Sequence, residues 1–173
     1  MPVTEKEEDI GMTGFFPVTS YLKGQLADIN RKGLTPLKYT TLHNQTDSTW
    51  LKPADYKEAF KEFLSPEIDS ANLTPFFSEK KFMDRTLDAF TFTYDPAGPI
   101  PDSISLHHWD VYIDPSTGRV KRVYMVKQFN SNTTIQLTWM NDKWCKMTTF
   151  IELPNGISSI EKEEKIIWDF DIQ

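Results

Sequence analysis

A chain of 173 residues fits a single globular domain, and its net charge of −6 makes it poorly suited to binding a phosphate backbone. We therefore expect no nucleic-acid partner. Hydrophobic residues form 39% of the chain and aromatic residues 13%, which excludes an intrinsically disordered protein, and no apolar stretch is long enough to predict a transmembrane helix. The single cysteine, Cys145, excludes an internal disulfide and a multi-cysteine zinc site.

The first 13 residues are polar and acidic, and they lack the basic start and the apolar core of a secretory signal. We expect residues 1–13 to form a flexible acidic leader and residues 14–173 to form one domain.

A first helix is predicted within FFPVTSYLKGQLADINRKG. Pro17 suits the start of a helix and Gly33 suits the residue just past its end. Between them the apolar residues recur at helical spacing: Val18, Tyr21, Leu22, Leu26 and Ile29.

The next segments alternate between strand and helix signals. LTPLKYTTLHN has the composition of a strand, and the polar NQTDS after it indicates a turn. KPADYKEAFKEFL then predicts a second helix that ends at Ser65-Pro66. Residues 66–86 give mixed signals and allow either a helical turn or a strand.

The second half of the chain has the two-residue period of strands. DAFTFTYD is followed by ISLHHWDVYI, RVKRVYMVKQF, TTIQLTWM and KWCKMTTFIEL, with a last candidate at EKIIWDFDI, where Asp169 and Asp171 alternate with apolar residues. Short connections allow only antiparallel neighbours. The predicted fold is α+β, with N-terminal helices packed on a C-terminal antiparallel meander, and a curved or barrel-like sheet is an open alternative.

The register of one hairpin follows from its apolar residues. A two-residue turn after Met140 would place the lysine of the second arm beside the leucine of the first. A three-residue loop at Asn141, Asp142 and Lys143 instead pairs Trp139 with Cys145, and it keeps the apolar sets together. This loop places Trp144 on the other face of the sheet.

The run DPSTG begins like a calcium loop but lacks its ligands. The twelfth position from Asp114 is Met125 rather than Glu, and the sixth is Arg119 rather than Gly. We interpret the run as a hairpin turn in which the Asp114 carboxylate accepts backbone hydrogen bonds and Gly118 takes the left-handed conformation.

His107 and His108 are candidates for catalysis or metal binding. Adjacent residues of a strand point to opposite faces, so the two imidazoles cannot share an ion unless the strand bulges there, and His43 could contribute only through a tertiary contact. No nucleophile motif and no glycine-rich phosphate loop occurs, and we predict no metal and no cofactor.

The number of aromatic rings is the feature that most suggests a binding surface. Rings such as Tyr94 and Tyr124 suit a core, but a row of Trp and Tyr on a sheet also suits a sugar or a protein partner. The candidate binding residues are Trp109, Tyr112, Trp144, Trp168, His107 and His108.

The strings FFPVTSYLKGQL, DVYIDPSTGRVKRVYMV and TIQLTWMNDKWCKM resemble segments of uncharacterised exported lipoproteins of gut-type bacteria. The resemblance covers about half of the chain and includes no catalytic motif. It implies a domain in the periplasm or at the cell surface, anchored through a lipidated cysteine upstream of this sequence.

Three functions stay open. The first is a noncatalytic envelope domain that binds a protein partner or a glycan through aromatic residues on a sheet face. The second is a carrier of a small apolar ligand inside a curved sheet. The third is a hydrolase that uses His107 or His108.

Overall fold

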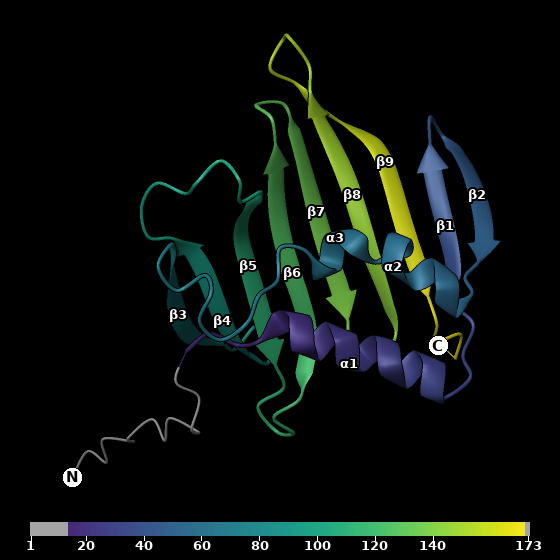
Figure 1. The fold of residues 1–173 in the computed structure, drawn as a ribbon, viewed down its shortest axis with the longest axis horizontal. Coiled ribbons are helices and arrows are strands. Elements are labelled where there is room, and N and C mark those ends of the chain that lie inside the picture. The colour runs from purple at the N-terminus through teal and green to yellow at the C-terminus, as the bar shows by residue number, and fades with distance from the viewer. Residues whose placement is uncertain (1–13, 172–173) are drawn as a thin grey trace.

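The computed structural model describes residues 14–171 as one nine-stranded antiparallel sheet with short helices (Figure 1). The strand order is β2-β1-β9-β8-β7-β6-β5-β4-β3. The strands are β1 (Leu37–Leu42), β2 (Gln45–Trp50), β3 (Phe77–Asp84), β4 (Ala89–Pro96), β5 (Leu106–Ile113), β6 (Val120–Phe129), β7 (Thr133–Met140), β8 (Trp144–Glu152) and β9 (Ser158–Ile167).

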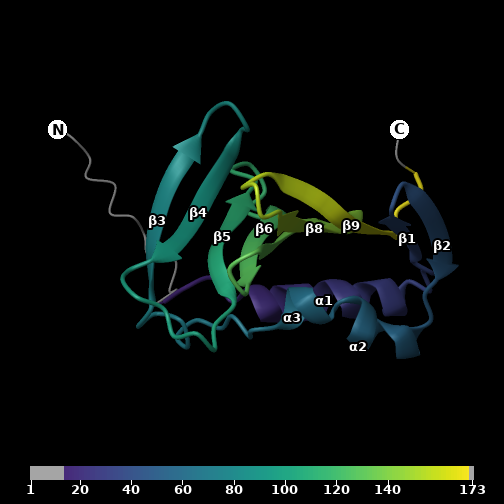
Figure 2. The ribbon, with the colours of Figure 1, turned by 90° about the horizontal axis from the view of Figure 1, so that it is seen from above.

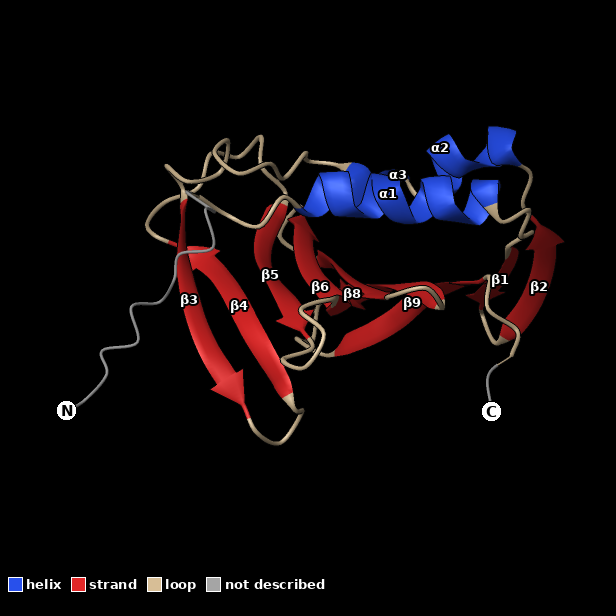
Figure 3. Ribbon diagram, turned by 90° about the horizontal axis from the view of Figure 1, so that it is seen from below, coloured by secondary structure: helices blue, strands red, loops and turns tan. Residues whose placement is uncertain are grey.

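The helices all lie on one side of the sheet (Figures 2 and 3). They are α1 (Val18–Arg31), the 3₁₀ turn η1 (Pro53–Asp55), α2 (Tyr56–Ala59) and α3 (Lys61–Leu64). We call this side of the sheet the helix-covered face and the other side the open face. Because β2 and β3 are unpaired edges, the sheet is open and does not close into the barrel that the sequence left as an alternative.

The fold is mostly β, so the predicted α+β class is correct only in outline. The predicted meander from β4 to β9 is confirmed, with each strand pairing with the next one in the chain, and β3 extends it by pairing with β4. The β1–β2 hairpin does not follow that order, because β1 pairs with β9 from the far end of the chain. No local pattern in the sequence contains this pairing.

Helix α1 lies where its apolar stripe predicts. Val18, Leu22 and Ile29 are buried against the sheet, and Gly33 just beyond the helix has a φ of +66°. The second predicted helix is broken into η1, α2 and α3, with Phe60 outside helical geometry between α2 and α3. Phe60 and Phe63 both pack against the ring of Trp139, and this tertiary packing outweighs the helical pattern.

Two predictions at strand ends are wrong. The predicted turn NQTDS contains most of strand β2, because the chain already reverses at His43 and Asn44, whose φ angles are +50° and +61°. The last strand ends at Ile167, since the backbone N–H groups of Trp168 and Asp169 both donate to the carbonyl of Lys143 instead of continuing the ladder.

The segment that the sequence left undecided divides into a loop and strand β3. The acidic leader expected at residues 1–13 lies outside the described residues. Among residues 14–171, no helix has the length and apolar character needed to cross a membrane.

The predicted register of β7 and β8 is confirmed. Trp139 pairs with Cys145, and Met140 pairs with Trp144, around the three-residue loop in which Asp142 has a φ of +61°. Trp139 therefore faces the helices, and Trp144 lies on the open face.

The core fills the space between the helices and the sheet with rings. Tyr94 stacks on Trp109 with the ring centroids 4.6 Å apart, and Phe77 meets the same indole edge-on at 4.7 Å. At the other end, Trp139 packs against Trp168 with the centroids 5.0 Å apart. The helix-covered face is thus closed by the packing of these rings.

Candidate functional site

The six candidate binding residues divide between the two faces. Trp109 and Trp168 are buried in the core and have no surface to offer a ligand. Tyr112, Trp144 and His108 are partly exposed. Their pairing partners place all three on the open face. His107 is also partly exposed, at a β-bulge between Leu106 and His108.

His108 lies between two carboxylates of neighbouring strands. Its Nδ1 is 2.7 Å from Asp95 Oδ1, and its Nε2 is 2.9 Å from Asp110 Oδ2. Asp110 also accepts hydrogen bonds from the hydroxyls of Thr93 and Tyr112. Both ring nitrogens of His108 therefore have a carboxylate partner, and an imidazolium can donate to both.

The charges of this cluster support one another. The hydrogen bonds that His108 donates to Asp110 and to Asp95 raise the pKa of His108 to about 9, although burial acts in the opposite direction. Burial alone would raise the pKa of Asp110, but the hydrogen bonds from His108 and Thr93 outweigh it and lower that pKa. At neutral pH His108 is a cation without a free lone pair, so it cannot serve as a general base.

The described residues contain no cluster suited to a metal. Within residues 14–171 no group of three or more His, Cys, Asp or Glu side chains has an arrangement that could hold a metal ion. His43 lies in the β1–β2 turn, at the opposite end of the sheet from β5. Cys145 is buried in the core, which raises the pKa of its thiol and makes it a poor nucleophile.

One row of side chains crosses the open face from edge to edge, and it connects all nine strands through directly paired residues. We call it the open-face row. From β3 to β2 it contains Phe82, Thr91, Tyr112, Arg122, Met140, Trp144, Ile167, Leu37 and Trp50. Since neighbouring strands lie about 4.8 Å apart, eight spacings give the row a contour length of about 38 Å.

The ends of the open-face row are its most exposed parts. Phe82 on edge strand β3 is 47% exposed, and Trp50 on edge strand β2 is 58% exposed. Trp50 packs against Phe170, which is itself 54% exposed, with the ring centroids 5.9 Å apart. The helices lie on the other side of the sheet (Figure 3), whereas Thr91 within the row is buried.

Cations lie over the rings in the middle of the row. The guanidinium of Arg122 is 4.3 Å from the centre of the Tyr112 ring, and the ammonium of Lys165 is 4.7 Å from that of Trp144. Each pair combines a flat apolar surface with a positive charge.

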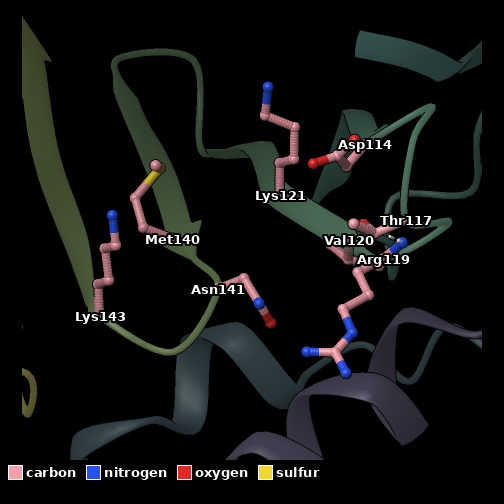
Figure 4. Close-up of a pocket in the computed structure, with 8 residues that line it drawn as sticks. All are labelled: Asp114, Thr117, Arg119, Val120, Lys121, Met140, Asn141 and Lys143. Atoms are coloured by element: carbon pink, nitrogen blue, oxygen red, sulfur yellow. Dashed lines mark hydrogen bonds between the residues drawn. The ribbon is translucent and has the colours of Figure 1, made fainter.

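A pocket of about 310 Å³ opens beside the row, between the β5–β6 and β7–β8 loops (Figure 4). In Figure 4, Lys121, Lys143 and Met140 point to the same side, whereas Arg119 extends toward the helices. The lining residues are Asp114, Thr117, Arg119, Val120, Lys121, Met140, Asn141 and Lys143.

The turn that borders this pocket forms as predicted. The Asp114 carboxylate accepts hydrogen bonds from the backbone N–H and the hydroxyl of Ser116, and Gly118 has a φ of +70°. These bonds, led by the one from the Ser116 hydroxyl, lower the pKa of Asp114. The turn forms one wall of the pocket.

Of the nine members of the row, the sequence predicts only Tyr112 and Trp144 as binding residues, and the members that it misses include Trp50, Phe82 and Arg122. Trp50 follows a segment taken for a turn, and Phe82 lies in the segment left undecided. Arg122 belongs to a predicted strand, but only the register of β5 and β6 shows that it lies over Tyr112. Period-two alternation predicts the face of Trp144, but the other members of the row follow only from the pairing of the strands.

No family model matches the chain, and neither a curated protein nor a solved structure matches it.

Proposed function

We propose that this protein is a noncatalytic domain that binds a glycan on the open face of its sheet. The observation that carries the proposal is the open-face row, in which the partly exposed Tyr112 and Trp144 lie at the centre and the exposed Trp50 lies at one edge. Trp and Tyr rings present flat apolar area that suits the face of a sugar ring. A row about 38 Å long suits an extended chain of sugars better than a single one.

The neighbouring row supplies the polar groups that a glycan needs. Tyr124, Thr138 and Tyr39 each lie two residues along their strand from a member of the open-face row, so their side chains lie on the same face. Their hydroxyls donate and accept hydrogen bonds, as sugar hydroxyls do. An apolar row beside a hydroxyl row can hold both the faces and the edges of a sugar chain.

The alternatives have weaker support. A hydrolase would need a free base, and both nitrogens of His108 are already hydrogen-bonded to carboxylates. A carrier would need a cavity under the helices, and the rings around Trp109 and Trp139 fill that space. The envelope location implied by the resemblance remains part of the proposal.

A protein partner is the second candidate. Tyr, Trp, Met and Arg are enriched at protein interfaces, and the centre of the open-face row consists of Tyr112, Arg122, Met140 and Trp144. A partner protein would bury this centre, whereas a glycan would also use the exposed Trp50.

The test is calorimetric titration of the protein with a panel of oligosaccharides. We expect binding that Trp144→Ala and Trp50→Ala each weaken by about tenfold, which corresponds to about 1.4 kcal/mol. The matched control is Ile157→Ala, which removes an exposed apolar side chain from the β8–β9 turn. Equal affinity in all three variants, or no binding by the wild type, would overturn the proposal.

A further inference from the structure

Two lysines face each other across the middle of the open face. Lys146 of β8 and Lys165 of β9 are directly paired residues, and both are partly exposed. Like charges at directly opposed positions destabilise a sheet. Within the described part of the chain, neither ammonium forms an ion pair with a carboxylate, and Glu163 is the acidic side chain of the next pair on this face.

Further cations surround this pair. Lys143 lies in the loop immediately before Trp144, and Arg122 is one strand away from Met140 in the open-face row. Lys165 itself lies over the Trp144 ring. In a chain with a net charge of −6, these cations lie together near β8 and β9, whereas the carboxylates of Asp95 and Asp110 on the same face lie on β4 and β5 and are hydrogen-bonded to His108.

We infer that the ligand of the open face is an acidic glycan, and that Lys146 and Lys165 form the centre that binds its carboxylate or sulfate groups. An anion placed between the two ammonium groups converts their repulsion into two attractive contacts. Trp144 lies beside this centre with the Lys165 ammonium over its ring, so a sugar that contacts the remaining exposed part of the indole presents its acidic substituent to the lysines. The inference rests on the proposed function, which it narrows from glycans in general to acidic ones.

The inference predicts that removing Lys146 changes ligand affinity and protein stability in opposite directions. Removing Lys146 removes the repulsion in the free protein and also removes half of the anion site. Lys146→Thr should therefore raise the denaturant midpoint of the free protein while it weakens ligand binding, as expected where function opposes stability. A lysine kept only for solubility would produce no such opposition.

The experiment compares an oligogalacturonate with the same oligomer after methyl esterification of its carboxylates. We expect the acidic form to bind about tenfold more tightly in low salt, and added salt to weaken only that form. Lys146→Thr should abolish the preference and Lys146→Arg should retain it. The control, Lys57→Ala, removes the same charge from the exposed surface of α2 and should change neither property. A sulfated oligomer of equal length then separates sulfate from carboxylate as the preferred group.

The outcomes that contradict the inference differ from those that contradict the proposed function. Equal binding of acid and ester, weakened by Trp144→Ala, would overturn the inference and leave glycan binding intact. Absence of binding to either oligomer would overturn the inference, and absence of binding to the whole panel of oligosaccharides would overturn both. Tighter binding of a single-stranded DNA oligomer than of any acidic glycan would replace the inferred ligand with a nucleic acid, since rings and cations on a sheet also suit stacked bases.

Discussion

Gln25 of helix α1 accepts a hydrogen bond from the indole nitrogen of Trp139 at 3.2 Å, inside the interface between helix and sheet. The same oxygen accepts the backbone N–H of Asp142 at 2.8 Å, and the Gln25 amide donates to the Asp142 carboxylate at 2.9 Å. One buried side chain therefore joins α1 both to the core indole and to the loop that sets the register of β7 and β8.

Gln25→Ala should lower the free energy of unfolding by about 2 kcal/mol, because it leaves the buried indole N–H without an acceptor. Chemical denaturation of the two proteins measures this difference. Lys23→Ala, an exposed change on the same helix, should alter the value by less than about 0.5 kcal/mol. A Gln25 variant as stable as the wild type would show that water replaces the lost partner.

The two faces of the sheet predict opposite results for two tryptophans. Trp109→Ala removes a fully buried indole and should destabilise the protein by about 4 kcal/mol. Trp144→Ala removes a partly exposed ring and should cost less than about 1.5 kcal/mol while it weakens ligand binding. Thermal and chemical unfolding, measured beside ligand titration, separate the two effects, and a severe loss of stability in Trp144→Ala would assign that ring to the core.

Local patterns in the sequence are sufficient to assign some of the aromatic side chains to a face of the sheet. Alternation through the β7–β8 hairpin predicts the face of Trp144, because slipping the register by one residue would bury a lysine. Alternation does not show which face of β5 packs against the helices. The sequence therefore predicts both Trp109 and Tyr112 as candidate binding residues. The pairing of β1 with β9, which brings Trp50 into the open-face row, depends on contacts between distant parts of the chain.

Lys127 ties the α3 segment to the sheet. Its side chain is 1% exposed, and its ammonium donates to the backbone carbonyls of Glu62 and Ser65. Burial lowers the pKa of this amine, and the Glu62 carboxylate opposes the shift.

Lys127→Ala should therefore lower the free energy of unfolding by about 3 kcal/mol, through a cavity and two carbonyls without donors. The matched control is Lys121→Ala, because Lys121 also donates to two backbone carbonyls, those of Leu87 and Asp88, but it is only partly buried. The control should lose less than about 1 kcal/mol in the same denaturation experiment. Similar losses of unfolding free energy in the two variants would mean that the burial of Lys127 does not increase the stability that its hydrogen bonds provide.

The Asp95–His108–Asp110 cluster predicts a dependence of stability on pH. The folded protein raises the pKa of His108 from 6.5 to about 9, so the folded state holds this proton more tightly than the unfolded state does. The resulting stabilisation is fully present below pH 6.5 and is lost as the pH rises through about 9. With allowance for the partial exposure of the imidazole, it amounts to about 2 kcal/mol.

His108→Gln should remove this contribution, so the difference in unfolding free energy between the two ends of that pH window should shrink by about 2 kcal/mol. Denaturation at several pH values measures the difference, and His43→Gln in the exposed β1–β2 turn serves as the control for losing a histidine. An NMR titration of the His108 imidazole provides an independent check. A midpoint near 6.5 would show that the carboxylates of Asp95 and Asp110 do not hold the proton, and His108 would again become a candidate base.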